Sequence, residues 1–456
     1  MKKKLLLFIM SFAICFGAIV APITVIVRAE DDELIQTTDE SAETSESSVT
    51  SDSEPFDVAA KAAIAIDPVS GKIFYAKNVD EAMGIASITK TITAYLTLEA
   101  IKNGTLHWDD KIMMSDYAYE LTQNPEASNI AVMNKDETFT IRDLFNAAMI
   151  QSANSAAITL AETIGGSEPK FVDMMKAKLT YWGISDAKLV NATGLSNSVL
   201  GENIYPGSAE TDENQLSAKD VAIIAQHLIS DFPEILETTK KTEAIFDEGG
   251  ESEQELTTYN YMLPTLPAAR DGVDGLKTGT TEFAGACFVA TTIQNDFRII
   301  TVVLNAENAE NDDYARFSET SGLMNYVYGN WKTQDIALKG VKMANHGAPN
   351  KLTVLDGNQK SVEVLPAENF SAVVPMLDMD TKTTIAFNKK QNANVTAAIK
   401  KGQKLVRVTF SIKDDLGYLP NHDGETFYLT ATTSVKRSNA IKVMWNHFVK
   451  FINDKL

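Results

Sequence analysis

The sequence of 456 residues predicts a mixed α/β (α+β) domain, then a small all-β sandwich domain and a C-terminal amphipathic helix. Three observations support this prediction. Strand patterns are followed by helical patterns and then by strand patterns again before residue 307. Short β-type runs separated by turn residues fill residues 342–435, and residues 436–456 carry an apolar stripe at helical spacing. A chain of this length is long enough for two or three domains.

Bulk composition excludes some classes of function. The hydrophobic fraction is 44%, which is enough for a sizeable core, and the formal net charge is -20, which disfavours binding to nucleic acid. If the N-terminal apolar run that contains Cys15 is removed, Cys287 is the one remaining thiol and no intramolecular disulfide can form. We expect Cys287 to be a buried small hydrophobe. We expect no metal and no cofactor, because no metal-ligand cluster or phosphate-binding loop stands out.

The N-terminus has the pattern of a secretory signal peptide over residues 1–29. Basic residues 2–4 precede the apolar run 5–27, and Val27-Arg28-Ala29 resembles an Ala-x-Ala-type cleavage site. An uncleaved membrane anchor is the alternative, because the run is long enough to span a bilayer. Residues 30–55 are acidic and rich in Ser and Thr, which predicts a disordered linker.

The first domain is predicted over residues 56–332. Apolar runs at 60–65 and 73–76 flank the turn signal Asp67-Pro68-Val69-Ser70-Gly71 and predict a β-hairpin. Helices are expected at 89–102, 141–164 and 218–229. Residues 283–306 form two strands around Gln294-Asn295-Asp296. The order strand, helix, strand predicts a sheet that closes around a mostly helical insertion.

The sandwich is predicted over residues 333–435, with strands at 352–354, 372–374, 384–387, 406–412 and 427–433. The helix predicted over 436–456 has basic residues around it and an apolar stripe made of Ile441, Met444, Trp445, Phe448, Val449 and Ile452. This pattern is typical of a helix that lies in a membrane surface. The alternative is a helix that packs this stripe on its own domain.

Three short motifs occur in a fixed order: Ser87-Ile88-Thr89-Lys90, Ser152-Ala153-Asn154 and Lys277-Thr278-Gly279. Ser-x-x-Lys alone is uninformative, since it recurs at 167–170 and 185–188. Ser-x-Asn and Lys-Thr-Gly, in contrast, each occur once. The ordered set is the signature of penicillin-interacting serine enzymes.

These residues suit nucleophilic catalysis by serine. Ser87 precedes a helix, whose dipole favours negative charge on its oxygen. Lys90 lies one turn later and can take the Ser87 proton if burial and the charge of Lys277 depress its pKa. Ser152 can relay a proton to the leaving nitrogen, and Asn154 can hold a substrate amide and a lysine.

The third motif suits the binding of a peptide end. Lys277 and the Thr278 hydroxyl can bind a terminal carboxylate. We expect Gly279 to remove a side chain where the substrate approaches, and the strand edge to accept a peptide as an added strand. The backbone N–H groups of Ser87 and Thr280 are candidates for an oxyanion hole.

With these motifs the chain resembles the low-molecular-mass penicillin-binding proteins, specifically the serine-type D-alanyl-D-alanine carboxypeptidases of the Ser-x-x-Lys acyltransferase superfamily. Further family-like motifs are 67–71, Asn191-Ala192-Thr193-Gly194-Leu195, 217–220 and 274–279. The resemblance implies a penicillin-binding/β-lactamase-like catalytic domain. It also implies an acyl-enzyme on Ser87, removal of the terminal D-Ala from peptidoglycan pentapeptide stems, and covalent inhibition by β-lactams. Thr280 departs from relatives that have His there, which leaves the rate of deacylation open.

The location implied is the outer face of the cytoplasmic membrane, with residues 436–456 as a peripheral anchor. Two rival functions stay open. A class A β-lactamase would need a Glu-x-x-x-Asn element, which residues 188–194 lack. A non-catalytic wall-binding or sensor protein would explain secretion and the β domain, but it would not need the full set of site residues.

Overall fold

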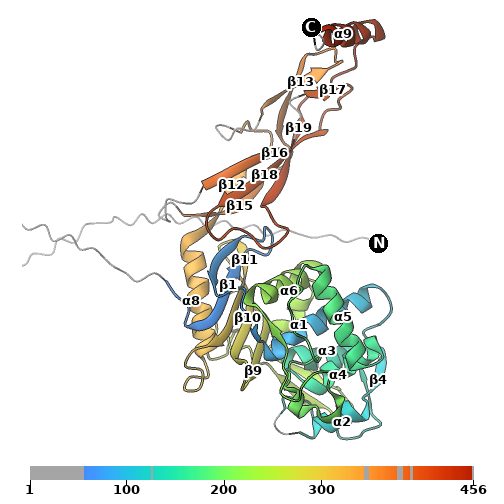
Figure 1. Ribbon diagram of the computed structural model, residues 1–456, viewed down its shortest axis with the longest axis vertical. Coiled ribbons are helices and arrows are strands. Elements are labelled where there is room, and N and C mark those ends of the chain that lie inside the picture. The colour runs from blue at the N-terminus through green and yellow to red at the C-terminus, as the bar shows by residue number, and fades with distance from the viewer. Residues whose placement is uncertain (1–55, 125–126, 344–348, 377–383, 391–393, 454–456) are drawn as a thin grey trace, which may run out of the picture. The chain divides into compact units, whose positions relative to one another are not determined.

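The computed structural model describes residues 56–456, apart from 125–126, 344–348, 377–383, 391–393 and 454–456 (Figure 1). The chain divides into two units, Met1–Pro55 and Phe56–Leu456, and the second unit contains all described residues. The expected signal peptide and linker therefore lie outside the described residues.

A five-stranded antiparallel sheet forms the centre of the first domain, with the order β2-β1-β11-β10-β9 (Figure 1). Its strands are β1 (Ala60–Ile66), β2 (Ile73–Lys77), β9 (Val273–Thr281), β10 (Gly285–Gln294) and β11 (Phe297–Ala306). The N-terminal hairpin thus pairs with strands that follow more than two hundred residues later, through pairs such as Ala63 and Val303. The prediction that the sheet closes around a helical insertion is confirmed, and β9 is an edge strand.

Alternation along β1 explains why the sheet is covered on both faces. Ile64 and Ile66 belong to the core shared with the helical insertion, whereas Ala63 and Ala65 belong to the core shared with α8 (Ala315–Asn330). Successive side chains of a strand point to opposite faces, so both sets can be buried at once. Figure 1 shows α8 on one side of the sheet and α1 and α6 on the other.

The insertion contains helices α1 (Lys90–Lys102), α2 (Asp116–Thr122), α3 (Ile141–Ile150), α4 (Asn154–Gly165), α5 (Glu168–Tyr181), α6 (Ala218–Asp231) and α7 (Ile235–Thr239). Short 3₁₀ turns lie at Ala86–Thr89, Asn197–Val199 and Gly201–Asn203. Three small two-stranded sheets pair β3 (Met83–Gly84) with β6 (Gln215–Leu216), β4 (Lys111–Met113) with β5 (Thr138–Thr140), and β7 (Glu243–Phe246) with β8 (Gln254–Thr257).

The single helix predicted over 141–164 is wrong, because the chain breaks between α3 and α4. Ser152 has a φ of +61°, a left-handed backbone that cannot continue a right-handed helix. Apolar spacing continues across the break, so periodicity alone does not show it. As a result the second motif spans a turn, and Asn154 begins α4. The helix predicted from residue 89 begins as α1 at Lys90, directly after a 3₁₀ turn.

The β domain has a two-stranded sheet, β12-β15, and a six-stranded sheet, β16-β18-β19-β14-β13-β17. Their strands are β12 (Trp331–Ala337), β13 (Lys351–Leu355), β14 (Ser361–Pro366), β15 (Phe370–Pro375), β16 (Thr384–Lys390), β17 (Asn394–Thr396), β18 (Lys404–Lys413) and β19 (Glu425–Ala431). Phe370 of the small sheet stacks on Phe427 of the large one, with ring centroids 4.7 Å apart. The predicted β domain is confirmed. The prediction omits β12, β14 and β17, although on β14 buried Val362 and Val364 alternate with polar residues as a strand requires.

The C-terminal helix α9 spans Ala440–Asn453, four residues later at its start than predicted. Its apolar side chains face solvent: Ile441 is 77% exposed, Trp445 64% and Phe448 56%. On α9, His447 Nε2 lies 3.1 Å from the Asp356 carboxylate of the β domain. Within the described ranges, no helix has the length and apolarity needed to cross a membrane.

Candidate active site

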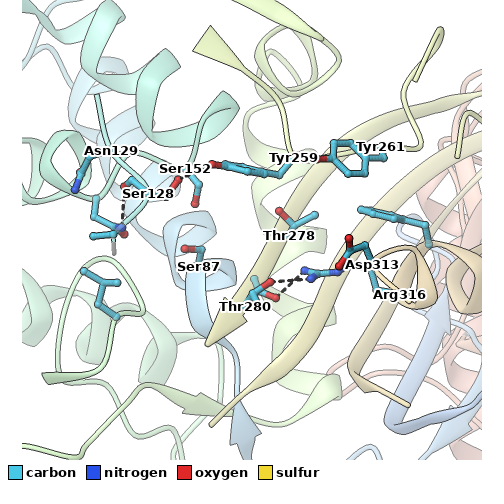
Figure 2. A pocket seen from close by; sticks show the side chains of 15 residues that line it. Ser87, Ser128, Asn129, Ser152, Tyr259, Tyr261, Thr278, Thr280, Asp313 and Arg316 are labelled. Atoms are coloured by element: carbon cyan, nitrogen blue, oxygen red, sulfur yellow. Dashed lines mark hydrogen bonds between the residues drawn. The ribbon is translucent and has the colours of Figure 1, made fainter. Parts of the chain in front are cut away.

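Ser87 lies in the 3₁₀ turn Ala86–Thr89, which leads directly into α1. The side chain lines a pocket of about 730 Å³. Figure 2 shows Ser87 near Ser152 on one side of this pocket, with Thr278 and Thr280 on the facing side. The structure therefore brings residues of all three sequence motifs together.

Lys90 is the centre of the polar contacts around Ser87. Its side chain is fully buried, and its Nζ lies 2.9 Å from Ser87 Oγ, 2.6 Å from Asn154 Oδ1 and 2.9 Å from the Thr193 carbonyl oxygen. Burial, with a further contribution from the charge of Lys277, holds the pKa of Lys90 well below its usual range. A neutral amine can donate to Asn154 and Thr193 and keep its lone pair for the Ser87 hydroxyl. The geometry is that of a general base beside a nucleophile.

The second motif supplies a wall of the pocket. Ser152 and Asn154 both line it, and both side chains are at least 96% buried. Asn154 Nδ2 donates to the Ser128 carbonyl oxygen at 2.9 Å, which fixes the amide so that its oxygen faces Lys90. The expected contact of Asn154 with a lysine is thus present.

The third motif lies on β9, at the edge of the sheet. Thr278, Gly279 and Thr280 line the pocket. Lys277 is buried, at 3% exposure, and its Nζ donates to the Thr278 carbonyl oxygen at 3.1 Å. Burial, followed by the charge of Arg316, lowers the pKa of Lys277 to about 7.

Glycine at position 279 is also required by packing, a role that the local sequence does not indicate. A Cβ at this position would lie 2.5 Å from the Ile85 carbonyl oxygen and 3.2 Å from the Ile88 nitrogen. The absence of a side chain therefore lets β9 pack against the turn that carries Ser87. Gly279 therefore sets the distance between β9 and that turn.

Arg316 is a site residue that lies outside the three sequence motifs. It lies on α8 and donates from Nη1 to the Gly279 carbonyl oxygen at 2.9 Å and from Nη2 to Thr280 Oγ1 at 2.8 Å. Arg316 also lines the pocket, with Asp313 beside it (Figure 2). The other lining side chains outside the motifs include the aromatic residues Tyr259, Tyr261 and Phe317. A lone arginine in a helix gives no sequence signal, since only the fold brings α8 to the end of β9.

The segment Asn191–Gly194 forms a tight loop against the Ser87 turn. Asn191 Oδ1 accepts from the backbone nitrogens of Thr193 at 3.2 Å and Gly194 at 2.7 Å. Gly194 has a φ of +86°, and a Cβ there would lie 1.8 Å from the Ala86 carbonyl oxygen. The loop can therefore deliver the Thr193 carbonyl to Lys90 only with glycine at position 194.

Replacing Gly194 by alanine is expected to lower the free energy of unfolding by about 3 kcal/mol or more, from the left-handed backbone plus the collision with Ala86. Gly166 is the matched control. It also has a positive φ, +75°, but a Cβ there would meet nothing within 4 Å. Gly166→Ala should cost only about 1–2 kcal/mol. Urea unfolding of both variants measures the difference, and equal losses would contradict the packing argument.

Cys287 lies in the environment that its sequence context predicts. Cys287 is fully buried, as predicted, and burial raises the pKa of its thiol to about 11. In the part of the chain that the structure describes, no group of three or more His, Cys, Asp or Glu side chains is arranged to hold a metal ion.

Comparison with known proteins identifies the family. Residues 48–308, more than half of the chain, match the model of the family Peptidase_S11, described as D-alanyl-D-alanine carboxypeptidase. The chain belongs to this family. Residues 332–437 match a second model, described as the penicillin-binding protein 5 C-terminal domain.

Curated relatives of this Peptidase_S11 chain include D-alanyl-D-alanine carboxypeptidase DacF of Bacillus subtilis, 29% identical over 348 residues. That match covers 76% of this chain and 80% of the relative. D-alanyl-D-alanine carboxypeptidase DacC of Escherichia coli is 27% identical over 358 residues, covering 78% of this chain and 80% of the relative.

Among solved structures, a peptidoglycan synthesis regulatory factor (PBP3) from Streptococcus pneumoniae is 41% identical, with a TM-score of 0.73. The match covers 83% of this chain and 100% of the Streptococcus pneumoniae chain. Penicillin-binding protein 5 from Haemophilus influenzae has a TM-score of 0.62 at 24% identity, covering 84% of this chain and 99% of that one, and supports the fold.

The resemblance inferred from the motifs is confirmed. As a member of Peptidase_S11, the chain is a serine-type carboxypeptidase of cell wall biogenesis. The two rival functions, a β-lactamase and a non-catalytic wall-binding or sensor protein, are not favoured by these matches.

Proposed function

We propose that this carboxypeptidase removes the terminal D-Ala from peptidoglycan pentapeptide stems through an acyl-enzyme on Ser87. The observation that carries the proposal is the contact of 2.9 Å between Lys90 Nζ and Ser87 Oγ, inside a pocket that Ser152 and Thr278 also line. The lowered pKa of Lys90 supports its role as proton acceptor.

The reaction follows from these positions. Ser87 Oγ attacks the carbonyl carbon of the penultimate D-Ala, and Lys90 takes the hydroxyl proton. The backbone N–H groups of Ser87 and Thr280 stabilise the oxyanion. The carbon–nitrogen bond then breaks, Ser152 relays the proton to the leaving nitrogen, and D-Ala departs. Water cleaves the resulting ester and restores the Ser87 hydroxyl.

The substrate binds along the edge of β9 as an added strand. The Thr278 and Thr280 hydroxyls bind its terminal carboxylate, and Asn154 holds a backbone amide. Positive charge for the carboxylate comes from Arg316, which lines the pocket, and from Lys277, whose Nζ donates to the Thr278 carbonyl oxygen. The β-lactams bind as covalent inhibitors, because their strained amide acylates the same Ser87.

The test of this function uses the unmodified protein. A peptide ending in D-Ala-D-Ala should release free D-Ala, and incubation with a β-lactam should give an adduct that peptide mapping by mass spectrometry places on Ser87. Rapid turnover of the β-lactam without release of D-Ala from the peptide would instead favour a β-lactamase. Labelling at another residue would refute the assignment of the nucleophile.

We propose the following division of the chain: a signal peptide at 1–29, a linker at 30–55, the catalytic domain at 56–332, the β-sandwich at 333–435 and an anchoring segment at 436–456. The protein is exported and acts at the outer face of the cytoplasmic membrane. The support for the anchor is the exposed apolar face of α9, which carries Trp445 and Phe448. Such a face binds the boundary between headgroups and acyl chains.

The anchor is testable with vesicles of anionic phospholipid. A protein that lacks residues 1–29 should sediment with the vesicles, and the double variant Trp445→Glu, Phe448→Glu should stay in the supernatant. Asn446→Glu is the matched control, since it adds a charge to α9 at an exposed polar position. Equal sedimentation of the double variant and the control would remove the basis for the anchor.

A further inference from the structure

Glu168 is a buried carboxylic acid beneath the site. It is the first residue of α5, and its side chain is only 4% exposed. Its Oε1 accepts from the Ala192 backbone nitrogen at 2.8 Å, and its Oε2 accepts from the Tyr117 hydroxyl at 3.0 Å. A buried acid is costly unless its oxygens have partners, and both oxygens have one here.

The Glu168 contact acts on the loop that holds Lys90. The Ala192 N–H donates to Glu168, and the Ala192 carbonyl oxygen accepts from Thr93 Oγ1 at 2.7 Å. The next carbonyl along the chain, that of Thr193, accepts from Lys90 Nζ at 2.9 Å. Hydrogen bonds therefore fix both the N–H and the carbonyl group of Ala192. Ala192 directly precedes Thr193, whose carbonyl oxygen orients the Lys90 amine.

The orientation of that amine matters for catalysis. A neutral Lys90 has two hydrogens and one lone pair, and Asn154 Oδ1 and Thr193 O receive the two hydrogens. The lone pair then has one direction left, toward Ser87 Oγ. If the Thr193 carbonyl moves, the amine can rotate, and a displacement on the order of 1 Å in a reacting pair can cost about 10²-fold in rate.

Glu168 does not need to be ionised for this task. Burial, helped by the charge of the neighbouring Glu162 and opposed by the bonds from Ala192 and Tyr117, raises the pKa of its carboxyl to about 7. A neutral carboxyl keeps a carbonyl oxygen that can accept from the Ala192 N–H. The contact therefore survives titration of the group.

We propose that Glu168 is a positioning residue for the acylation step: through the Ala192 N–H it fixes the Thr193 carbonyl and so aims the Lys90 amine at Ser87. This inference rests on the proposed role of Lys90 as proton acceptor. Glu168 touches neither Ser87 nor the substrate. Its role is also distinct from that of a glutamate that activates water for deacylation, because it is closed off under the loop.

The experiment separates the rate constant of acylation from the non-covalent dissociation constant of a fluorescent penicillin, measured by stopped flow. Glu168→Met fills a similar volume but has no acceptor for Ala192, and it should lower the acylation rate constant about 10–100-fold at an unchanged dissociation constant. Glu168→Gln keeps the acceptor oxygen, and its amide can donate to Tyr117. It should stay within about threefold of the unmodified protein.

A second buried polar residue controls for loss of stability. Gln226 is 6% exposed, and its Nε2 donates to the Pro68 carbonyl oxygen at 2.9 Å in a contact that does not involve the pocket residues. Gln226→Ala should destabilise the fold and leave the acylation rate constant unchanged. Equal loss of rate in Glu168→Met and Glu168→Gln, or in Gln226→Ala, would overturn the proposal.

Two further measurements complete the experiment: a second Glu168 variant and the labelling of the unmodified protein. If Glu168→Met does not fold, Glu168→Asp withdraws the carboxyl from Ala192 and should lower the acylation rate constant in the same direction. Suppose that the unmodified protein is labelled on Ser87. An unchanged acylation rate constant in Glu168→Met, or in Glu168→Asp if only that variant folds, then refutes the positioning role but not the proposed function. Absence of that label in the unmodified protein would instead refute the proposed function.

Discussion

Replacing Ser87 by alanine is expected to abolish both the release of D-Ala and the covalent penicillin adduct. Alanine has no oxygen to attack the carbonyl carbon, and no other hydroxyl lies beside the Lys90 amine among the contacts described for it. Any residual rate should come only from the backbone donors and binding groups that the variant keeps. Gel fluorescence with a labelled penicillin and an assay for free D-Ala measure the two losses independently.

The matched control uses a serine from another Ser-x-x-Lys sequence. Ser185 is exposed and precedes Lys188 by the same spacing, so Ser185→Ala should keep full labelling and full activity. The chain offers this comparison because spacing alone does not make a site. Persistent labelling of Ser87→Ala would show that the nucleophile lies elsewhere.

Replacing Lys90 by alanine is expected to slow acylation by about 10²–10⁴-fold, the usual contribution of a positioned general base. Folding should suffer less than from loss of a buried hydrophobe, since the variant also relieves the burial of an amine. The second-order rate constant for a fluorescent penicillin is the measurement. Lys170→Ala is the control, because Lys170 is exposed and belongs to a Ser-x-x-Lys sequence without partners.

The role of Lys90 as general base also determines the direction in which the acylation rate changes with pH. The reactive form of Lys90 is the neutral amine, so the acylation rate should rise with pH through the pKa of Lys90. Burial and the charge of Lys277 lower that pKa, which places the rise well below the range of an ordinary lysine. Lys277→Met removes the positive charge of Lys277, which should raise the pKa of Lys90 and move the increase in acylation rate to higher pH. A pH profile of Lys90→Ala with the same rise would contradict the assignment.

The sequence predicts most of the site because its chemistry is carried by short motifs. Ser87 and Lys90 are three residues apart, which places them on one face where the chain is helical, and the contacts of Lys90 with Asn154 and Thr193 complete the arrangement. The third motif is likewise a run of three adjacent residues, and it lies on the edge strand β9. These predictions depend on local spacing, which a sequence records directly.

The parts that could not be predicted depend on long-range packing. Ser152 adopts a positive φ inside an apolar pattern that reads as one helix. Arg316 becomes a site residue only because α8 crosses the end of β9, and Glu168 reaches Ala192 only because α5 packs under the loop. Lys277 is buried although it lies on an edge strand, and this burial does not follow from local spacing.

Cys287 has a practical consequence for the study of this enzyme. The thiol is fully buried in the sheet, and its raised pKa keeps it protonated and therefore unreactive toward alkylating reagents at neutral pH. Within residues 56–456 it is the one cysteine of the sequence. A cysteine introduced on the exposed face of α9 or at the rim of the pocket would thus be a site for selective attachment of a fluorophore or spin label. Membrane contact and loop motion could then be followed separately on otherwise native protein.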